Sequence, residues 1–277
     1  MRPALLRRAI NRTKRAVNDA KLFALPHNYP GVRLTPKRVL NYWLVRWEQR
    51  RGHVRLRGYP LVLTVESTNV CNLRCPACFT GDGQTGRPKS MLPLPVYERL
   101  LGELGDRLLQ IEFYNWGESL LNKNVCTMIR GAADKGISTI ISSNLSFPMD
   151  DARAEEIVRS GLHVLGVSLD GATQAVYEQY RVRGDINLVF ENVRKIAAAK
   201  ERLRSSTPDL VYEYHLFPHN LHEIEAARAR ALELGMTLMV SKGWVAGPDW
   251  DEKGEFKRRL QAGAGPVRLS VEPRHRA

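Results

Sequence analysis

From about residue 60, short apolar runs alternate with longer amphipathic segments along the chain. Short apolar runs are typical of buried strands, and apolar positions repeated every three or four residues are typical of helices. The pattern predicts strands at 61–66, 109–114, 138–142, 164–168, 210–215 and 237–240, with helices near 93–104, 122–135, 151–160, 186–203 and 221–234. Such βα alternation predicts an α/β fold, here a partial (βα)6 barrel of parallel strands, open rather than closed with eight.

The N-terminal segment, residues 1–58, follows a different pattern and predicts a basic helical extension. Residues 4–23 read as one amphipathic helix. A second helix is expected over residues 35–51, because a threonine followed by proline is a favoured helix start. We expect this second helix to pack on the barrel as a lid, with Trp43 and Trp47 buried against it.

Two further boundaries follow from the same pattern. The core barrel is expected over residues 59–242. Beyond it the periodicity fades, and residues 243–277, rich in glycine, proline and mixed charge, predict an irregular C-terminal tail.

The net charge of +13 belongs to the N-terminal segment. Residues 1–60 hold 15 lysines and arginines against Asp19 and Glu48, a net of 15 − 2 = +13. The rest holds 42 − 15 = 27 basic and 29 − 2 = 27 acidic residues, a net of zero. Basic amphipathic helices bind anionic membranes, and basic segments also attract nucleic acid. Attachment of residues 4–23 to an anionic membrane surface is therefore a hypothesis.

The chain has four cysteines, and three of them, Cys71, Cys75 and Cys78, fall within eight residues. Thiols this close do not suit a disulfide framework, and clustered thiols in a reducing cytoplasm bind metals. No secretory signal is visible, and no apolar stretch reaches the roughly 20 residues that span a bilayer. We therefore expect a cytoplasmic protein, peripheral to the membrane if residues 4–23 attach. Cys126 lies in an amphipathic segment and reads as a small buried hydrophobe.

The spacing of the three cysteines is C-x3-C-x2-C, shortly after the first predicted strand. A structural zinc site usually has a fourth cysteine or histidine ligand. The histidines closest in sequence are His53 and His163, and neither is adjacent to the motif. An iron–sulfur cluster also usually takes four thiolates, so three of them leave one iron open to bind something. A structural zinc site completed by an outside ligand remains an alternative.

This motif, placed after the first strand of a partial (βα)6 barrel, resembles the defining motif of the radical S-adenosylmethionine (SAM) superfamily. The resemblance implies that Cys71, Cys75 and Cys78 ligate three irons of a [4Fe–4S] cluster and that SAM chelates the fourth iron. The family usually has an aromatic residue just before the third cysteine, where this chain has Ala77. Phe79, on the other side of Cys78, is expected to fill part of that space beside the cofactor.

A second segment supports the resemblance, residues 114–121 with the sequence YNWGESLL at the end of the second strand. It resembles the G-G-E-P motif that binds the amino group of SAM. Gly117 and Glu118 match the motif, Trp116 replaces its first glycine, and Ser119 replaces its proline. An ammonium group needs acceptors, which a carboxylate and strand-end carbonyls supply.

Polar residues at the next two strand ends complete the implied SAM site. The SSN turn at 142–144 resembles a T-N-G-type turn near the SAM ribose, which implies contacts from Ser143 and Asn144. Ser168, in a segment resembling V-S-[IL]-D-G, would point toward the SAM carboxylate or ribose. A turn-forming or capping role is about as consistent with each of these residues.

Arg183 resembles an arginine that pairs with the SAM carboxylate, a geometry that suits a guanidinium. Whether Arg181 or Arg183 faces inward stays open. His215 and His219, near the end of the fifth strand, could meet substrate, although structural histidines are more common.

The resemblance implies reductive cleavage of SAM to a 5′-deoxyadenosyl radical, which abstracts hydrogen from an unidentified substrate. Flavodoxin or ferredoxin is the usual reductant in the family, and substrate or the N-terminal helices are expected to cap the barrel mouth. Many relatives continue into a cysteine-rich SPASM domain, whereas this chain has no cysteine after Cys126. A truncated, catalytically impaired cluster-binding remnant therefore stands beside the zinc protein as an alternative.

Overall fold

The computed structural model describes residues 29–81, 83, 86–242 and 267–269, and its strands form one parallel sheet in the order β1 to β7. The strands are β1 (Val62–Thr64), β2 (Gln110–Glu112), β3 (Ser138–Ser143), β4 (Val164–Ser168), β5 (Asp209–Leu216), β6 (Thr237–Lys242) and β7 (Val267–Leu269). All six predicted strands are confirmed. Among the described strands β1 pairs only with β2 and β7 only with β6, so the barrel is open.

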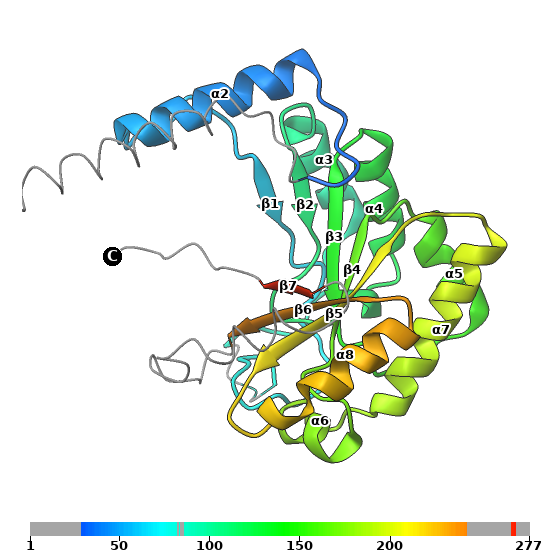
Figure 1. The fold of residues 1–277 in the computed structure, drawn as a ribbon. Coiled ribbons are helices and arrows are strands. Elements are labelled where there is room, and N and C mark those ends of the chain that lie inside the picture. Colours follow the sequence, from blue (N-terminus) through cyan, green and yellow to red (C-terminus); the bar gives the residue numbers. More distant parts are fainter. Residues whose placement is uncertain (1–28, 82, 84–85, 243–266, 270–277) are drawn as a thin grey trace, which may run out of the picture.

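The helices lie on the outer side of the curved sheet, except one that crosses an end of it (Figure 1). They are α2 (Pro36–Arg51), α3 (Leu94–Leu104), α4 (Val125–Asp134), α5 (Asp151–Arg159), α6 (Gln174–Tyr180), α7 (Ile186–Arg202) and α8 (Ile224–Glu233), with short 3-10 turns η1 (Ser119–Leu121) and η2 (Leu221–Glu223). The five predicted barrel helices are confirmed, although η2 forms the first turn of the last one. None of the helices in the described part of the chain is long and apolar enough to cross a bilayer.

The main core lies between the sheet and its helices, because successive strand residues point to opposite faces. On β5, Tyr212 and Tyr214 are fully buried on the helix side, while Glu213 between them faces the concave side. On β4, Leu165 and Val167 join the same core. Burial of each such side chain contributes roughly 1.5–3 kcal/mol. The concave side is left polar, which suits a site rather than a packed interior.

Helix α2 lies across the end of the sheet where the strands begin (Figure 1). Its Arg38 is 2% exposed and donates five hydrogen bonds to backbone carbonyl oxygens. The acceptors are Arg33, just before α2, and the residues of the loops that enter β2 and β3, Gly105, Leu108, Lys135 and Gly136. The cysteines follow β1 and so lie at the carboxyl ends of the strands, where active sites of parallel barrels are found. Helix α2 is therefore at the opposite end of the barrel from the cysteines. The expectation of a lid over the mouth is therefore wrong for α2, and Trp47 is 46% exposed rather than buried.

One α-helix and one strand were not predicted, and one predicted segment is not described. Helix α6 spans only seven residues, too few for a clear periodic pattern. Strand β7 interrupts the expected irregular tail with three residues that pair with β6, too short to show alternation. The amphipathic segment 4–23, for which membrane attachment is a hypothesis, lies outside the described residues.

Candidate functional site

Three cysteines lie together in the loop that follows β1. Cys75 is buried at 7% exposure, Cys71 and Cys78 are half-buried, and all three pack with Leu73, Tyr180 and Phe217. The rings of Tyr180 and Phe217 lie 4.4 Å apart. The apolar wall comes from segments that follow β4 and β5, so the fold brings distant strand ends to the cysteines.

The cysteine loop closes tightly on itself. The Cys78 amide donates to the Cys75 carbonyl oxygen at 3.2 Å, and Gly81 returns so close that a Cβ there would lie 2.4 Å from that same oxygen. Only glycine fits such a backbone approach. Gly81 was not predicted as a site residue, although a glycine three residues after the last cysteine was a signal for this return.

N–H groups lie near the sulfur atoms of Cys71 and Cys75. The Leu73 amide lies 3.4 Å from Cys71 Sγ, Asn144 Nδ2 lies 3.7 Å from the same sulfur, and Arg181 Nη1 lies 3.9 Å from Cys75 Sγ. N–H groups aimed at sulfur stabilise thiolates, and such contacts tune iron–sulfur clusters.

Burial shapes the protonation of these thiols. It raises the pKa of Cys71 to about 12 and also raises the pKa of Cys75. Among the residues that the structure describes, no three His, Cys, Asp or Glu side chains converge closely enough to hold one metal ion. The donor set of three soft thiols with N–H donors and an apolar wall fits an iron–sulfur cluster.

The segment after β2 is fixed against the cysteine loop by its backbone. A Cβ on Gly117 would lie 1.9 Å from the Thr68 carbonyl oxygen, and the Glu118 amide donates to the Val70 carbonyl at 2.8 Å. With Gly117 and Glu118 held in this way, the Trp116 carbonyl oxygen lies 3.9 Å from Cys78 Sγ. The predicted Gly-Glu pair therefore lies beside the cysteines, with a strand-end carbonyl exposed to the same space.

The Glu118 side chain is buried and already satisfied by protein donors. Its carboxylate accepts from the Ser143 hydroxyl at 2.8 Å, the Asn144 amide at 2.7 Å and the Leu120 amide at 3.1 Å. Burial raises its pKa. Glu118 and Ser143 therefore tie the ends of β2 and β3 together, while Asn144 Nδ2 reaches the cysteine loop.

The structure distinguishes the two candidate arginines. Arg183 is exposed in a left-handed turn with φ of 71°, and no described contact joins it to the cysteines. Arg181 takes the inward place, with its Nε donating to Asp170 Oδ2 at 2.7 Å and its Nη1 directed at Cys75.

Asp170 is the residue that orders this arginine. Its side chain is fully buried, and its other oxygen accepts from the His215 amide at 2.6 Å and lies 2.9 Å from His215 Nδ1. The nearby Arg181 and His215 hold the pKa of Asp170 at about 2, although burial alone would raise it. Sequence reasoning missed this role of Asp170, because its partners lie 11 and 45 residues away.

Ser168 faces the polar concave side of the sheet. Its hydroxyl lies 3.2 Å from Glu213 Oε2, and Ser142 donates to the same oxygen at 2.6 Å. A Cβ on Gly166 would lie 2.1 Å from Glu213 Oε1, so a glycine makes room for this carboxylate. Sequence reasoning missed Glu213. Its charge within an otherwise apolar stretch of a predicted strand was a signal that could have found it.

Phe79 and Trp116 form an edge-to-face pair with ring centroids 4.8 Å apart. Phe79 remains 53% exposed, so the pair stands at the rim of the cysteine loop. Cys126 is 3% exposed within the main core, as predicted, and the close His215–Asp170 contact fits the structural interpretation of that histidine.

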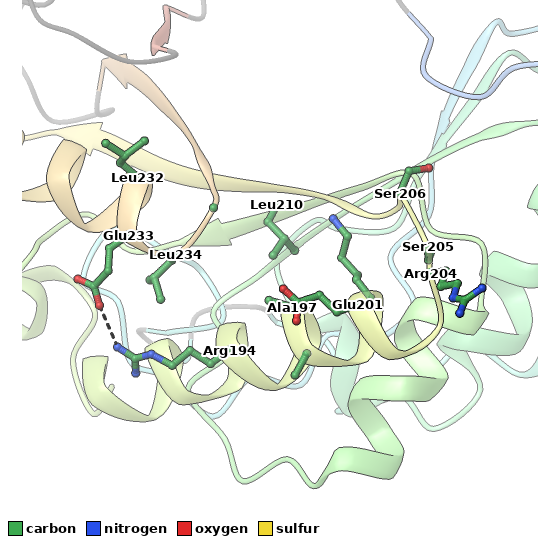
Figure 2. Close-up of a pocket in the computed structure, with 13 residues that line it drawn as sticks. Arg194, Ala197, Glu201, Arg204, Ser205, Ser206, Leu210, Leu232, Glu233 and Leu234 are labelled. Atoms are coloured by element: carbon green, nitrogen blue, oxygen red, sulfur yellow. Dashed lines mark hydrogen bonds and ion pairs between the residues drawn. The ribbon is translucent and has the colours of Figure 1, made fainter.

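A groove on the outer side of the barrel lies between α7 and α8 (Figure 2). It is lined by the C-terminal parts of both helices and by the loops that enter β5 and β6, at the opposite end of the strands from the cysteines. Arg194 and Glu233 form an ion pair across it at 3.4 Å. None of the motif residues lines this groove, so it is not the candidate site.

The sequence profile of the radical SAM superfamily matches residues 65–231, more than half of the chain and the whole of the site just described. The chain therefore belongs to the radical SAM superfamily.

Individual relatives are more distant. A probable GTP 3′,8-cyclase of Methanocaldococcus jannaschii is 27% identical over 135 residues, which cover 48% of this chain and 44% of that protein. The PqqA peptide cyclase of Bradyrhizobium diazoefficiens is 26% identical over 179 residues, covering 64% of this chain and 44% of that protein. The chain thus spans less than half the length of these relatives. Streptococcus suis SuiB has a similar fold, with a TM-score of 0.61 at 12% identity over 92% of this chain and 60% of SuiB.

Proposed function

We propose that this chain is a radical SAM enzyme that holds a [4Fe–4S] cluster on Cys71, Cys75 and Cys78. The observation that carries the proposal is that the three cysteines share one packed cluster, with the Trp116 carbonyl beside Cys78 and the Arg181 guanidinium beside Cys75. When bound and reduced, such a cluster supplies an electron that cleaves SAM to methionine and a 5′-deoxyadenosyl radical able to take hydrogen from a substrate.

The chain's own residues would bind and orient SAM. The Trp116 carbonyl would accept a hydrogen bond from the amino group of SAM, held in place by Gly117 and Glu118. Arg181 would meet the SAM carboxylate in place of Arg183, because Asp170 fixes it in the inward position. Asn144, at the end of β3, would lie close to the amino and carboxylate groups of SAM.

Other residues shape the surroundings. Phe79 and Trp116 would flank the cofactor at the rim, and Tyr180 with Phe217 would keep water from the cluster. Ser168 would contact the ribose, since the neighbouring Glu213 carboxylate favours a hydroxyl over a second anion. The substrate is not identified, and a flavodoxin or ferredoxin would supply the electron.

The test is anaerobic reconstitution with iron and sulfide, followed by dithionite, SAM and measurement of 5′-deoxyadenosine. The parent protein is expected to form 5′-deoxyadenosine and Cys75→Ala is expected to form none. Cys126→Ala is the matched control, because Cys126 is equally buried but lies in the core away from the motif.

Two outcomes would contradict the proposal in different ways. A protein that assembles a cluster but forms no 5′-deoxyadenosine would point to the impaired remnant. Equal loss of the cluster in Cys126→Ala would show that general destabilisation, rather than ligation by the motif, explains the Cys75 result.

A further inference from the structure

The C-terminal end of α2 and the loop after it form an exposed tip, residues 47–57. In Figure 1 this end of α2 projects past the edge of the sheet beyond β1. The loop is fixed rather than loose, because the buried Glu48 carboxylate accepts the amides of Arg57 at 2.8 Å and Gly58 at 3.0 Å. Gly52 ends the helix in a left-handed turn that directs the chain back.

Large apolar side chains are exposed on this tip. Val54 is 97% exposed, Leu56 is 53% exposed and Trp47 is 46% exposed. Single exposed apolar residues are common on proteins, but three within residues 47–57 of one fixed segment make this tip a candidate contact surface.

The same tip is strongly cationic. Residues 47–57 contain four arginines, Arg50, Arg51, Arg55 and Arg57, and one acid, Glu48, a formal charge of 4 − 1 = +3. Glu48 turns inward to the loop amides, so the exposed surface presents only positive charge. Arg51 lies over the Trp47 ring at 5.9 Å.

We infer that the 47–57 tip docks on the surface of an anionic phospholipid bilayer. Apolar side chains insert among lipid headgroups, while arginines around them meet lipid phosphates. Nucleic acid would use the charge and the Trp47 ring but not Val54 and Leu56, which offer no flat ring on which a base could stack. The inference does not depend on the proposed enzymatic function, because the tip lies at the end of the barrel opposite the cysteines.

The test uses the full chain and sedimentation with vesicles, either pure phosphatidylcholine or equal parts phosphatidylcholine and phosphatidylglycerol. We expect binding to the mixed vesicles only. Val54→Glu/Leu56→Glu and, separately, Arg51→Glu/Arg55→Glu should each weaken that binding about tenfold or more.

Matched controls separate the tip from general effects. Leu232→Glu changes another exposed leucine, and Lys89→Glu/Lys123→Glu makes the same change in net charge at exposed sites elsewhere. Both controls should bind within about twofold of the parent protein. If the glutamate pair fails to fold by circular dichroism, Val54→Ser/Leu56→Ser takes its place.

Three results would overturn the inference. The parent protein could fail to bind mixed vesicles, or the tip variants could bind them as tightly as the parent. Tip variants that lose binding to single-stranded RNA, but not to vesicles, would assign the patch to nucleic acid instead.

Discussion

Asp170 organises the candidate site at the scale of single residues. One oxygen binds Arg181, which is directed at Cys75, and the other binds both the backbone and the ring of His215. Removal of one member of a buried ion pair leaves the other charge uncompensated. The position of the inward arginine therefore depends on a carboxylate that does not itself touch a cysteine.

Asp170→Asn should lower the free energy of unfolding of the cluster-free protein by about 3–5 kcal/mol near neutral pH, because Arg181 loses its buried partner. The acid pKa of Asp170 is lowered in the folded state to about 2 from 3.8, so its contribution is present above about pH 4 and is lost as the pH falls toward about 2. The difference between parent and variant in urea titrations should therefore shrink across that interval.

The exposed pair Arg130–Asp134 provides the comparison for this substitution. Asp134→Asn breaks a surface contact of 3.7 Å and should cost less than about 1 kcal/mol. A loss for Asp170→Asn as small as that, or one that does not change with acidity, would contradict the assigned role of Asp170.

Gly117 makes a second prediction at this scale. Gly117→Ala would push a methyl group into the Thr68 carbonyl, at 1.9 Å, and into the Asn69 backbone at 3.0 Å. Neither contact can yield by side-chain rotation, so we expect a loss of about 1–3 kcal/mol and weaker cluster retention, read from absorbance of the reconstituted protein.

Gly102 is the matched control for Gly117. It lies within α3, and a Cβ there would meet nothing within 4 Å. Gly102→Ala should stabilise the protein by about 0.5–1 kcal/mol, because glycine is a poor helix residue. Equal effects of the two substitutions would show that the contact with residue 68 does not decide the geometry of the loop.

Local patterns predict contacts between neighbours well and contacts between distant residues poorly. The cysteines, Gly117 and Glu118 lie in short contiguous motifs, so they could be found from spacing. The Arg181–Asp170–His215 network joins residues on the loops after β4 and on β5, and no local pattern decides which of Arg181 and Arg183 turns inward. In the structure Asp170 binds Arg181, while Arg183 lies exposed in a left-handed turn.

At the scale of elements, alternation and period predicted six of the seven described strands, β7 being the exception, while the predicted location of α2 was wrong. A helix-start signal and an apolar stripe give the existence of a helix but not its docking site. The docking of α2 depends on Arg38, whose five acceptors are backbone carbonyls spread over three loops. Backbone acceptors leave no trace in the sequence, so this anchor could not be predicted.

Arg38→Met should detach α2 from the ends of β2 and β3. Hydrogen bonds from a charged donor contribute about 1.5–3 kcal/mol each at most, and the carbonyls would be left partly unpaired, so we expect a net loss of about 2–4 kcal/mol. Hydrogen exchange should rise in residues 36–51 more than in β3. Lys37→Met removes only an exposed contact with Asp106 and should leave hydrogen exchange unchanged. An equal rise of exchange in Lys37→Met would contradict the role of Arg38 in docking α2.

At the scale of the whole molecule, the candidate cluster site joins the carboxyl ends of three strands. Cys71, Cys75 and Cys78 follow β1, Tyr180 lies beyond β4 and Phe217 follows β5, and all pack together. The barrel is open between β1 and β7, so little of the sheet itself holds these ends in place. A ligand at the cysteines would therefore stabilise the molecule well beyond its own loop.

Cluster assembly should raise the midpoint of thermal unfolding, and the increase should grow as the pH rises. Anything bound only by the folded state stabilises it, and thiols must lose protons before they bind iron. Burial raises the pKa of Cys71 to about 12 and that of Cys75 as well, so assembly releases protons and is favoured by alkaline conditions. Anaerobic melting of cluster-loaded and cluster-free protein at mildly acidic and mildly alkaline pH measures this difference.

On cluster assembly, hydrogen exchange should fall together at residues 71–81, 180–184 and 214–220. Protection confined to residues 71–81, or an increase that is independent of pH or persists in Cys75→Ala, would mean that the cysteine loop binds its ligand without the rest of the barrel.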